Sequence, residues 1–184
     1  MIASQHISPG MTIALDGKVY RVESAIKVTV PKGTPFIKAK IKNLLTEETV
    51  EKSFKLQQTL EEVSLAERRL EFLYPEKPGY LFLDIDNFEQ VLIPANILSD
   101  KVNYLKEGIE VKAMSYGDAI LSIELPQFLE LMVVKIEEAS GASAAGATKV
   151  AVLETGAKVH VPMFIETGDI IKVDVFANEY VQRV

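Results

Sequence analysis

Apolar and polar residues alternate over short segments along most of the chain. Such alternation places successive side chains on opposite faces of a strand, and it is typical of half-buried β-strands. The segments are rich in β-branched and aromatic residues and are separated by turn residues. They cover residues 18–24, 27–30, 36–43, 80–86, 110–116, 119–125, 129–136, 149–156 and 170–176. Many short strands at nearly regular spacing predict a mainly β protein built from small barrels or sandwiches.

One segment, residues 94–107, has the spacing of a helix instead. Its apolar residues at positions i, i+4 and i+7 are Leu98, Val102 and Leu105. Pro94 stands at the start and Gly108 directly after the end, which is where these residue types favour a helix, so we predict one here. A second helical pattern over residues 60–70 leaves two alternatives open, a short helix or a loop that enters a strand.

Two breaks in the pattern divide the chain into three parts. The first break lies near residues 63–66, where the basic character of the chain ends. The second lies near residues 125–126, where a proline interrupts strands on both sides. We therefore predict three domains, at residues 1–64, 65–126 and 127–184.

Charge is distributed unevenly along the chain. The net charge of -6 argues at first against a nucleic-acid partner, because phosphate binding depends on Lys and Arg. When the chain is divided at residues 64 and 128, however, the three parts carry net charges of +2, -5 and -3. Residues 18–42 contain seven basic residues and one acidic residue, Glu23. This asymmetry predicts an anion-binding face on an otherwise acidic protein.

The composition argues against several other classes of protein. The 184 residues include no cysteine, which excludes disulfides, thiolate nucleophiles and Cys-ligated zinc. The chain has no apolar run of membrane-spanning length and no secretory signal pattern, so we expect a cytoplasmic protein without a membrane partner. His6 and His160 are isolated, and we interpret them as ordinary structural or surface residues. Because no nucleophile, base and orienting group occur together, we expect neither an enzyme nor a bound metal or cofactor.

One predicted hairpin carries the candidate chemistry. Lys38, Lys40 and Lys42 alternate with apolar residues, so strand geometry sends all three lysines to one face. Residues 31–35, with the sequence PKGTP, precede this strand; their prolines lack amide donors and their glycine permits unusual dihedral angles. We predict an open, projecting loop with Lys32 near its tip. An alternative is that the lysines only solvate an exposed face or protect an edge strand from aggregation.

Other residues have competing interpretations. Asp84 and Asp86 could hold a cation from one strand face, but solvated surface charges are the simpler interpretation. Residues 141–146 have the glycine spacing of a phosphate-binding loop but lack its lysine, which argues against nucleotide binding. Tyr180 and Arg183 could contact RNA, or the tyrosine could pack the final strand. We assign five phenylalanines to hydrophobic cores: Phe36, Phe54, Phe72, Phe82 and Phe164.

Ordered sequence motifs are present in all three parts of the chain. They read KGTPF at 32–36, KIKNLLT at 40–46 and VEKSF at 50–54, then LY at 73–74 and FEQ at 88–90, then LETGAKVHVPMFI at 153–165, GDIIKVD at 168–174 and EYVQR at 179–183. In this order the motifs resemble the bacterial elongation factor P family over the whole chain. The resemblance implies three small β-barrel domains in an L-shaped, tRNA-like arrangement, the second and third of oligonucleotide-binding (OB) type.

The resemblance also implies a function. Members of the family are non-enzymatic translation factors that bind the ribosome between the peptidyl and exit sites and relieve stalling at consecutive prolines. The residue that aligns with Lys32 approaches the acceptor end of the peptidyl-tRNA, and in many members it carries a covalent modification. We therefore expect as partners the ribosome with its ribosomal RNA, the peptidyl-tRNA and a lysine-modifying enzyme, and we expect a monomer. The residues expected to bind tRNA or ribosomal RNA are Lys27, Lys32, Gly33, Lys38, Lys40, Lys42, Tyr180 and Arg183.

The chain departs from the family pattern at three places. Val30 and Pro31 replace the Pro-Gly that commonly precedes the tip residue, and Pro35 replaces a small residue. The loop associated with the exit site aligns with Gly141 and Ser143 but lacks the family's aspartate. Residues 175–178, VFAN, replace a segment that contains an arginine. A second hypothesis, a generic single-stranded nucleic-acid binder built from small barrels, is opposed by the negative charge of the second and third parts.

Overall fold

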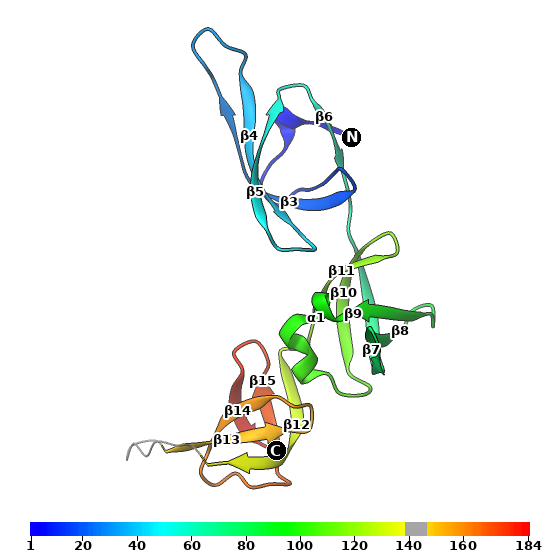
Figure 1. Cartoon of the computed structure of the whole chain (residues 1–184), viewed down its shortest axis with the longest axis vertical. Coiled ribbons are helices and arrows are strands. Elements are labelled where there is room, and N and C mark those ends of the chain that lie inside the picture. Colours follow the sequence, from blue (N-terminus) through cyan, green and yellow to red (C-terminus); the bar gives the residue numbers. More distant parts are fainter. Residues whose placement is uncertain (139–146) are drawn as a thin grey trace. The chain divides into compact units, whose positions relative to one another are not determined.

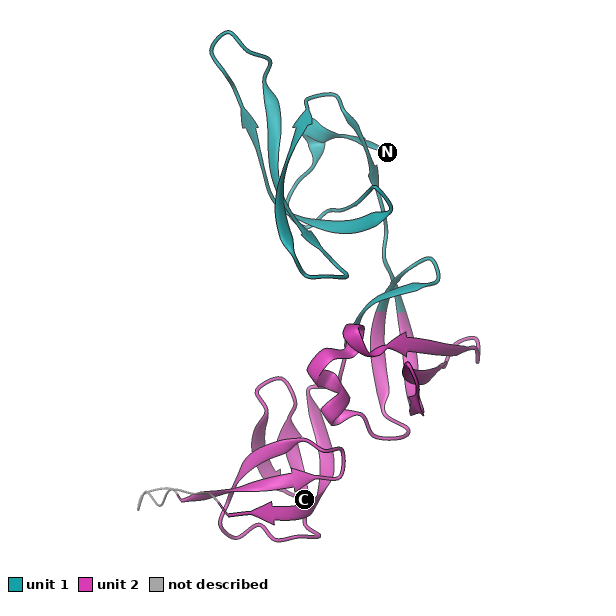
Figure 2. Ribbon diagram, viewed as in Figure 1, with its two compact units in different colours: residues 1–67, 114–122 teal, residues 68–113, 123–184 magenta. Residues whose placement is uncertain are grey.

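The computed structural model describes residues 1–138 and 147–184 and shows three antiparallel sheets (Figure 1). The chain forms two compact units (Figure 2). One contains Met1–Glu67 and Met114–Ser122, and the other contains Arg68–Ala113 and Ile123–Val184. No helix in the described ranges is long and apolar enough to cross a membrane. The predicted mainly β architecture is confirmed.

The first sheet contains six strands in the order β1-β6-β2-β3-β4-β5. Their bounds are Ile2–Ala3 (β1), Thr12–Leu15 (β2), Lys18–Val28 (β3), Phe36–Asn43 (β4), Thr49–Lys55 (β5) and Thr59–Glu62 (β6), with a 3-10 helix, η1, at Ser4–His6. Alternating apolar residues from the strands fill one core, as a period of two requires. This core contains Ile7, Ile13, Val22, Ile37, Ala39, Ile41, Phe54 and Leu60.

The second sheet contains five strands in the order β11-β10-β7-β8-β9. Their bounds are Ala66–Glu76 (β7), Gly79–Asp84 (β8), Gln90–Pro94 (β9), Glu110–Tyr116 (β10) and Ala119–Glu124 (β11). The tip of the β10–β11 hairpin belongs to the first compact unit, where Leu121 packs against Val19 and Val63. Ser115, in the same hairpin, donates a hydrogen bond to the carbonyl of Ala66 over 3.4 Å.

The helix predicted over residues 94–107 is confirmed only in part. The α-helix α1 covers only Ala95–Leu98, and a 3-10 helix, η2, follows at Ser99–Tyr104. The chain leaves the α conformation at Ser99, whose φ of 49° is incompatible with a continuous α-helix. Leu98 and Leu105 are nevertheless buried. Over residues 60–70 the alternative of a loop that enters a strand is confirmed, since the loop joins β6 to β7.

The third sheet has the order β14-β13-β12-β15-β16. Its strands are Phe128–Glu137 (β12), Thr148–Leu153 (β13), Lys158–Pro162 (β14), Ile170–Asp174 (β15) and Glu179–Arg183 (β16). Phe54, Phe72 and Phe82 are buried as predicted, and Phe36 is half-buried. The core position predicted for Phe164 is wrong, because this side chain is 57% exposed and the Arg183 guanidinium lies 5.5 Å from the centre of its ring.

Candidate nucleic-acid interface

The β3–β4 hairpin is the most basic element of the chain and projects from the first sheet (Figure 1). Directly opposite residues of an antiparallel pair share a face, so the register decides which side chains lie together. Lys38 lies opposite Ile26, Lys40 opposite Ser24 and Lys42 opposite Arg21. The predicted common face of the three lysines is therefore confirmed, and the alternating residues Ile37, Ala39 and Ile41 are buried on the other face.

The neighbouring strand β5 widens this surface. Lys55 lies opposite Phe36, and Glu51 lies opposite Lys40. The face formed by β3, β4 and β5 thus carries five cationic side chains, which we call the basic face: Arg21, Lys38, Lys40, Lys42 and Lys55. Glu51 is the acidic residue that the strand register places among them. Such a surface attracts a polyanion along its length.

The cations of the hairpin differ in their partners. Lys38 Nζ lies 3.1 Å from Glu51 Oε2, and Lys42 Nζ lies 4.0 Å from Glu47 Oε1. Within the described ranges, no ion pair joins Lys27, Lys32 or Lys40 to a carboxylate. Lys27 is exposed but lies opposite Ile37, which puts it on the face opposite to Lys38. No described carboxylate is therefore paired with Lys27 or Lys32, whereas Glu51 lies opposite Lys40 and is paired with Lys38.

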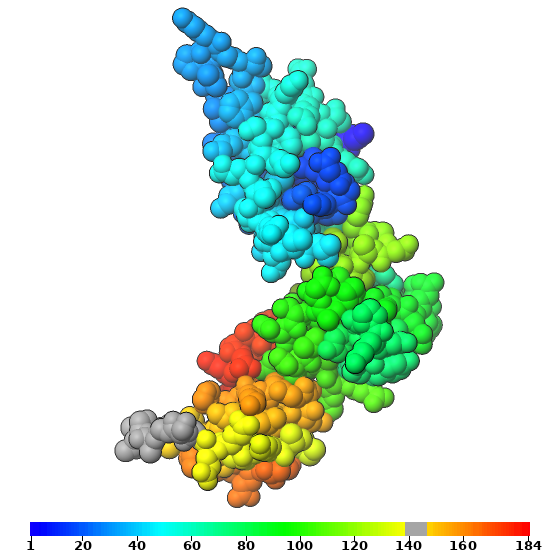
Figure 3. All heavy atoms as spheres, in the orientation of Figure 1, coloured from blue at the N-terminus to red at the C-terminus, as the bar shows by residue number. Residues whose placement is uncertain are grey.

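A tight turn forms the tip of the hairpin. The amide of Gly33 donates a hydrogen bond to the carbonyl of Val30 over 3.1 Å. Pro31 and Lys32 are the two central residues, and Lys32 has a φ of 62°. Proline at the first central position and a positive φ at the second match a type II turn, in which glycine or asparagine is usual at the second position. The hairpin thus holds an exposed lysine in a left-handed conformation at its tip. In Figure 3 the hairpin is the narrow blue projection.

Gly33 completes this turn for a steric reason. A Cβ atom at Gly33 would lie 3.1 Å from Val30 Cβ and 3.2 Å from Val30 Cγ1. Contacts this short require the neighbour to move, so a larger residue would disturb the turn. Gly33 is therefore a residue that shapes the tip. Its prediction as an RNA-binding residue remains a prediction.

Asn43 supports the other end of β4, a role that the sequence analysis did not predict. Its side chain is buried, and its Oδ1 accepts the amides of Leu45 (2.8 Å) and Thr46 (3.1 Å). Its own amide donates to the carbonyl of Glu48. These bonds fix the β4–β5 connection and hence the position of Glu51 beside the lysines. An Asn at the end of a strand and just before a turn is the only sequence signal that could have indicated this role.

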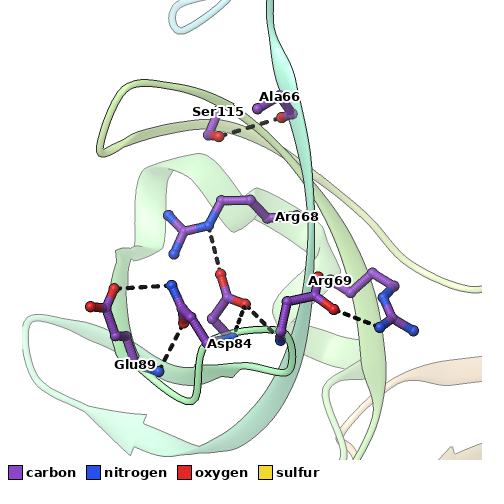
Figure 4. A network of polar contacts seen from close by, with 8 residues as sticks. Ala66, Arg68, Arg69, Asp84, Glu89 and Ser115 are labelled. Atoms are coloured by element: carbon purple, nitrogen blue, oxygen red, sulfur yellow. Dashed lines mark hydrogen bonds and ion pairs between the residues drawn. The ribbon is translucent and has the colours of Figure 1, made fainter.

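The interpretation of Asp84 as a solvated charge is wrong. Figure 4 shows its carboxylate between Arg68 and the following turn. Asp84 is 3% exposed, its Oδ2 accepts the Arg68 Nε–H over 2.8 Å, and its Oδ1 accepts the Asp86 amide over 2.9 Å. Burial alone would raise the pKa of Asp84, but the bonds from Arg68 and Asp86 outweigh it and lower the pKa. Asp84 is therefore a structural anchor for the β8–β9 turn.

Asp86 lies in that turn and stays largely exposed. It accepts a hydrogen bond from Arg69 over 2.7 Å, and this bond is the main reason that the pKa of Arg69 is raised. Because both aspartates are paired with arginines, they do not form a cation site. In the ranges 1–138 and 147–184, no cluster of three or more His, Asp or Glu side chains is placed to hold a metal ion.

The predicted residues of the third sheet have structural contacts of their own. Tyr180 is half-buried and lies opposite Val173. Arg183 Nη1 lies 3.9 Å from Asp169 Oδ2, in addition to its contact with Phe164. Their RNA contacts remain predictions. Gly141 and Ser143, the predicted exit-site loop, lie outside the described residues.

Three small antiparallel sheets and a basic hairpin define a class of proteins built from several small β-barrel domains, the first of which carries a basic face. Family models match nearly the whole chain: the elongation factor P KOW-like domain at residues 3–60, its OB domain at 65–123 and its C-terminal domain at 129–183. The chain is 62% identical to elongation factor P 1 of Protochlamydia amoebophila and 37% identical to elongation factor P of Moorella thermoacetica, with complete coverage of each chain. The chain therefore belongs to the elongation factor P family.

Solved structures agree with this fold. Translation initiation factor 5A from Methanococcus jannaschii matches with a TM-score of 0.51 and 14% identity, covering 66% of this chain and 94% of that one. A factor 5A family protein from Naegleria fowleri matches with a TM-score of 0.53 and 9% identity, covering 67% and 96%. Similarity at this level of identity supports the fold alone. Family membership makes the chain a translation elongation factor, which implies interaction with the ribosome.

Proposed function

We propose that the chain binds the ribosome between the peptidyl and exit sites and orders the acceptor end of the peptidyl-tRNA through Lys32. By doing so, it promotes peptide bond formation and relieves stalling at consecutive prolines. The observation that carries the proposal is the tip turn: an exposed lysine, free of any described ion pair, stands on a narrow hairpin backed by the basic face.

The physical basis is positioning rather than chemistry. Proline is conformationally restricted, and peptide bond formation requires the two substrates to be held in attack geometry. A cation fixed beside the RNA end of one substrate restricts its motion without transferring a proton or forming a covalent intermediate. The factor therefore acts without being an enzyme, and it needs no cofactor.

The tip turn suits this task because it is already ordered before binding. Pro31 restricts φ at the first central position, and the hydrogen bond from Gly33 to Val30 closes the turn. A preordered loop loses less conformational entropy when it binds than a flexible one. The lysines of the basic face then supply phosphate contacts that set the register of the hairpin on RNA.

We further propose that Lys32 is a modification site for a lysine-modifying enzyme. The amine is exposed and carries no described ion pair, so an enzyme can reach it. The factor acts as a monomer in the cytoplasm, where translation takes place. The tRNA-like outline implied by the family also stays a prediction.

Reconstituted translation of a message with several consecutive prolines tests the proposal. Full-length product is timed with no factor, with the wild-type chain and with Lys32→Ala. Lys52→Ala is the matched control, because Lys52 is an exposed lysine of the same sheet that lies opposite Ala39 and therefore outside the basic face. Relief by the wild type and by Lys52→Ala, but not by Lys32→Ala, supports the proposal.

Absence of relief by the wild type has two explanations that intact mass separates. If protein from its native host is heavier than the unmodified chain and restores relief, the modification is required. If the native protein is unmodified and inactive, the proposed function is wrong.

A further inference from the structure

A cleft of about 770 Å³ lies within the second compact unit, apart from the basic hairpin. It is bordered by η2, by the turn between β13 and β14 and by the turn between β15 and β16. Its volume falls in the range of pockets that take small organic groups, and clefts between sheets are a common position for them. The hairpin function described above makes no use of it.

Phe176 lines this cleft and lies in a turn that side-chain hydrogen bonds hold in place. Its side chain is 61% exposed, which leaves apolar aromatic surface in contact with water. The Asp174 Oδ1 atom accepts the amides of Phe176 (2.9 Å) and Ala177 (3.0 Å), while Gln127 donates to Oδ2 over 3.2 Å. The amide of Ala177 is the main reason that the pKa of Asp174 is lowered. The backbone that carries the Phe176 ring is therefore held in one conformation by these hydrogen bonds.

The rest of the cleft is preformed. Tyr104 is buried and donates its hydroxyl hydrogen bond to Asn178 Oδ1, and Asn178 Nδ2 donates to the carbonyl of Lys158 over 3.2 Å. Burial, with a smaller contribution from Asp174, raises the pKa of Tyr104, so its hydroxyl stays protonated and keeps donating. Leu125 and Ala157 add buried apolar surface. A ligand would find a rigid wall and one exposed aromatic ring.

The charges around the cleft favour an uncharged ligand. Lys158 lines it, but its Nζ is paired with Glu137 over 3.2 Å. Lys101 also lines it, and Asp100 on the same element offsets its charge. With two cations, Lys101 and Lys158, against three anions, Asp100, Glu137 and Asp174, the surroundings carry a small negative charge, unlike the basic face. A phosphate would gain little here, whereas a neutral planar group could stack on the ring and reach the amide of Asn103.

We propose that this cleft binds an unpaired nucleobase of RNA, stacked on Phe176. The inference rests on the proposed function, because that function makes RNA the partner of the chain. Stacking on an aromatic ring tolerates any base, since each base has a planar face. Binding in the cleft should therefore depend weakly on salt, while binding at the basic face should weaken steeply as salt rises.

The test is a titration of the ¹⁵N-labelled full-length chain, followed by the amide signals of each site. The probes are a five-nucleotide oligoadenylate and an abasic ribose-phosphate chain of the same length. We expect both probes to shift signals of the basic hairpin, and only oligoadenylate to shift those of Gly156, Ala157 and Asn178. Phe176→Ala should lower the affinity for oligoadenylate, measured from the cleft signals, about tenfold or more, as the loss of one stacked base predicts.

Phe164→Ala is the matched control, because Phe164 is similarly exposed in another turn between strands of the third sheet but is not among the residues that line this cleft. It should leave the cleft shifts unchanged. Equal cleft shifts with the abasic chain, or none with oligoadenylate, would overturn the proposal. A wild-type chain that relieves proline stalling without cleft shifts defeats this inference alone. One that shows the cleft shifts but gives no relief in its native form defeats the proposed function alone.

Discussion

At the scale of single residues, Lys32 combines an exposed cation with a left-handed backbone. A positive φ disfavours residues with a Cβ, and it disfavours β-branched residues most. Such conformations persist where the surrounding structure holds them, and here Pro31 and the Gly33 hydrogen bond do so. The tip residue is therefore not the residue that the turn alone would favour, which is consistent with a requirement for its side chain.

Substitution of Lys32 should separate stability from activity. Lys32→Gly removes the conformational cost of a left-handed residue with a Cβ atom, about 1 kcal/mol, which stabilises the folded chain. Glycine also raises the entropy of the unfolded chain, which destabilises the folded chain by about 0.4–1 kcal/mol. We expect the free energy of unfolding in urea to change little. Lys32→Val should lower it by about 1 kcal/mol, because a branched Cβ fits this φ poorly. Both variants should lose relief of proline stalling. Equal stability of the glycine and valine variants would contradict the strained turn.

The lowered pKa of Asp84 predicts that the stability of the fold depends on pH. Its folded pKa lies below the ordinary value of 3.8, so its contribution to stability is present above that pH and is lost as pH falls through the folded pKa. Asp84→Asn should lower the free energy of unfolding by roughly 3 kcal/mol at neutral pH, because it leaves Arg68 without its buried partner. The difference from the wild type should shrink below about pH 4.

Urea unfolding between pH 7 and pH 3 measures this effect. Asp86→Asn is the control, since it removes an exposed carboxylate from a pair with Arg69. Exposed pairs contribute less than about 1 kcal/mol. If the two variants lose the same stability at neutral pH, Asp84 is not the anchor of the β8–β9 turn.

At the scale of elements, alternation along β4 was enough to predict the basic stripe, because a strand period of two leaves no other arrangement of Ile37, Ala39 and Ile41. The local pattern of apolar and polar residues gave wrong predictions where the structure depends on a distant residue or on a single dihedral angle. Asp84 is buried by Arg68, sixteen residues away. The predicted helix ends at Leu98 because of the φ of Ser99. The left-handed tip at Lys32 has no signature in apolar spacing.

The basic face should show unequal contributions from its lysines. Lys40 has no described ion pair, whereas Lys38 is held by Glu51. Lys40→Gln should therefore weaken binding to single-stranded RNA more than Lys38→Gln. It should also reduce the slope of log K against log salt by about 0.7, the value for one phosphate contact on a single strand. Fluorescence anisotropy at several salt concentrations measures both quantities. Identical slopes for the two variants would show that the Glu51 pair does not compete with phosphate.

At the scale of the whole molecule, one compact unit contains the third sheet and the larger part of the second sheet, while most of β11 belongs to the other unit. Two polar contacts join the second and third sheets. Tyr104 donates to Asn178, and Lys106 Nζ lies 2.9 Å from Glu154 Oε1, which also accepts the Met132 amide over 3.0 Å. Burial raises the pKa of Glu154, but the Met132 amide and Lys106 outweigh it and lower the pKa. The carboxylate is thus charged and doubly held near neutral pH.

These contacts predict that the two sheets unfold together. In native-state hydrogen exchange, the slowest amides of β8 and of β12 should open with the same free energy in the wild type. Tyr104→Phe combined with Lys106→Ala removes one bond from each contact, at about 0.5–1.5 kcal/mol each, and should make the third sheet open separately from the second. Lys135→Ala is the matched control, because Lys135 pairs with Glu137 on its own strand. Separate opening in the wild type would mean that the two contacts do not couple the sheets, and that the cleft at Phe176 lacks a rigid wall.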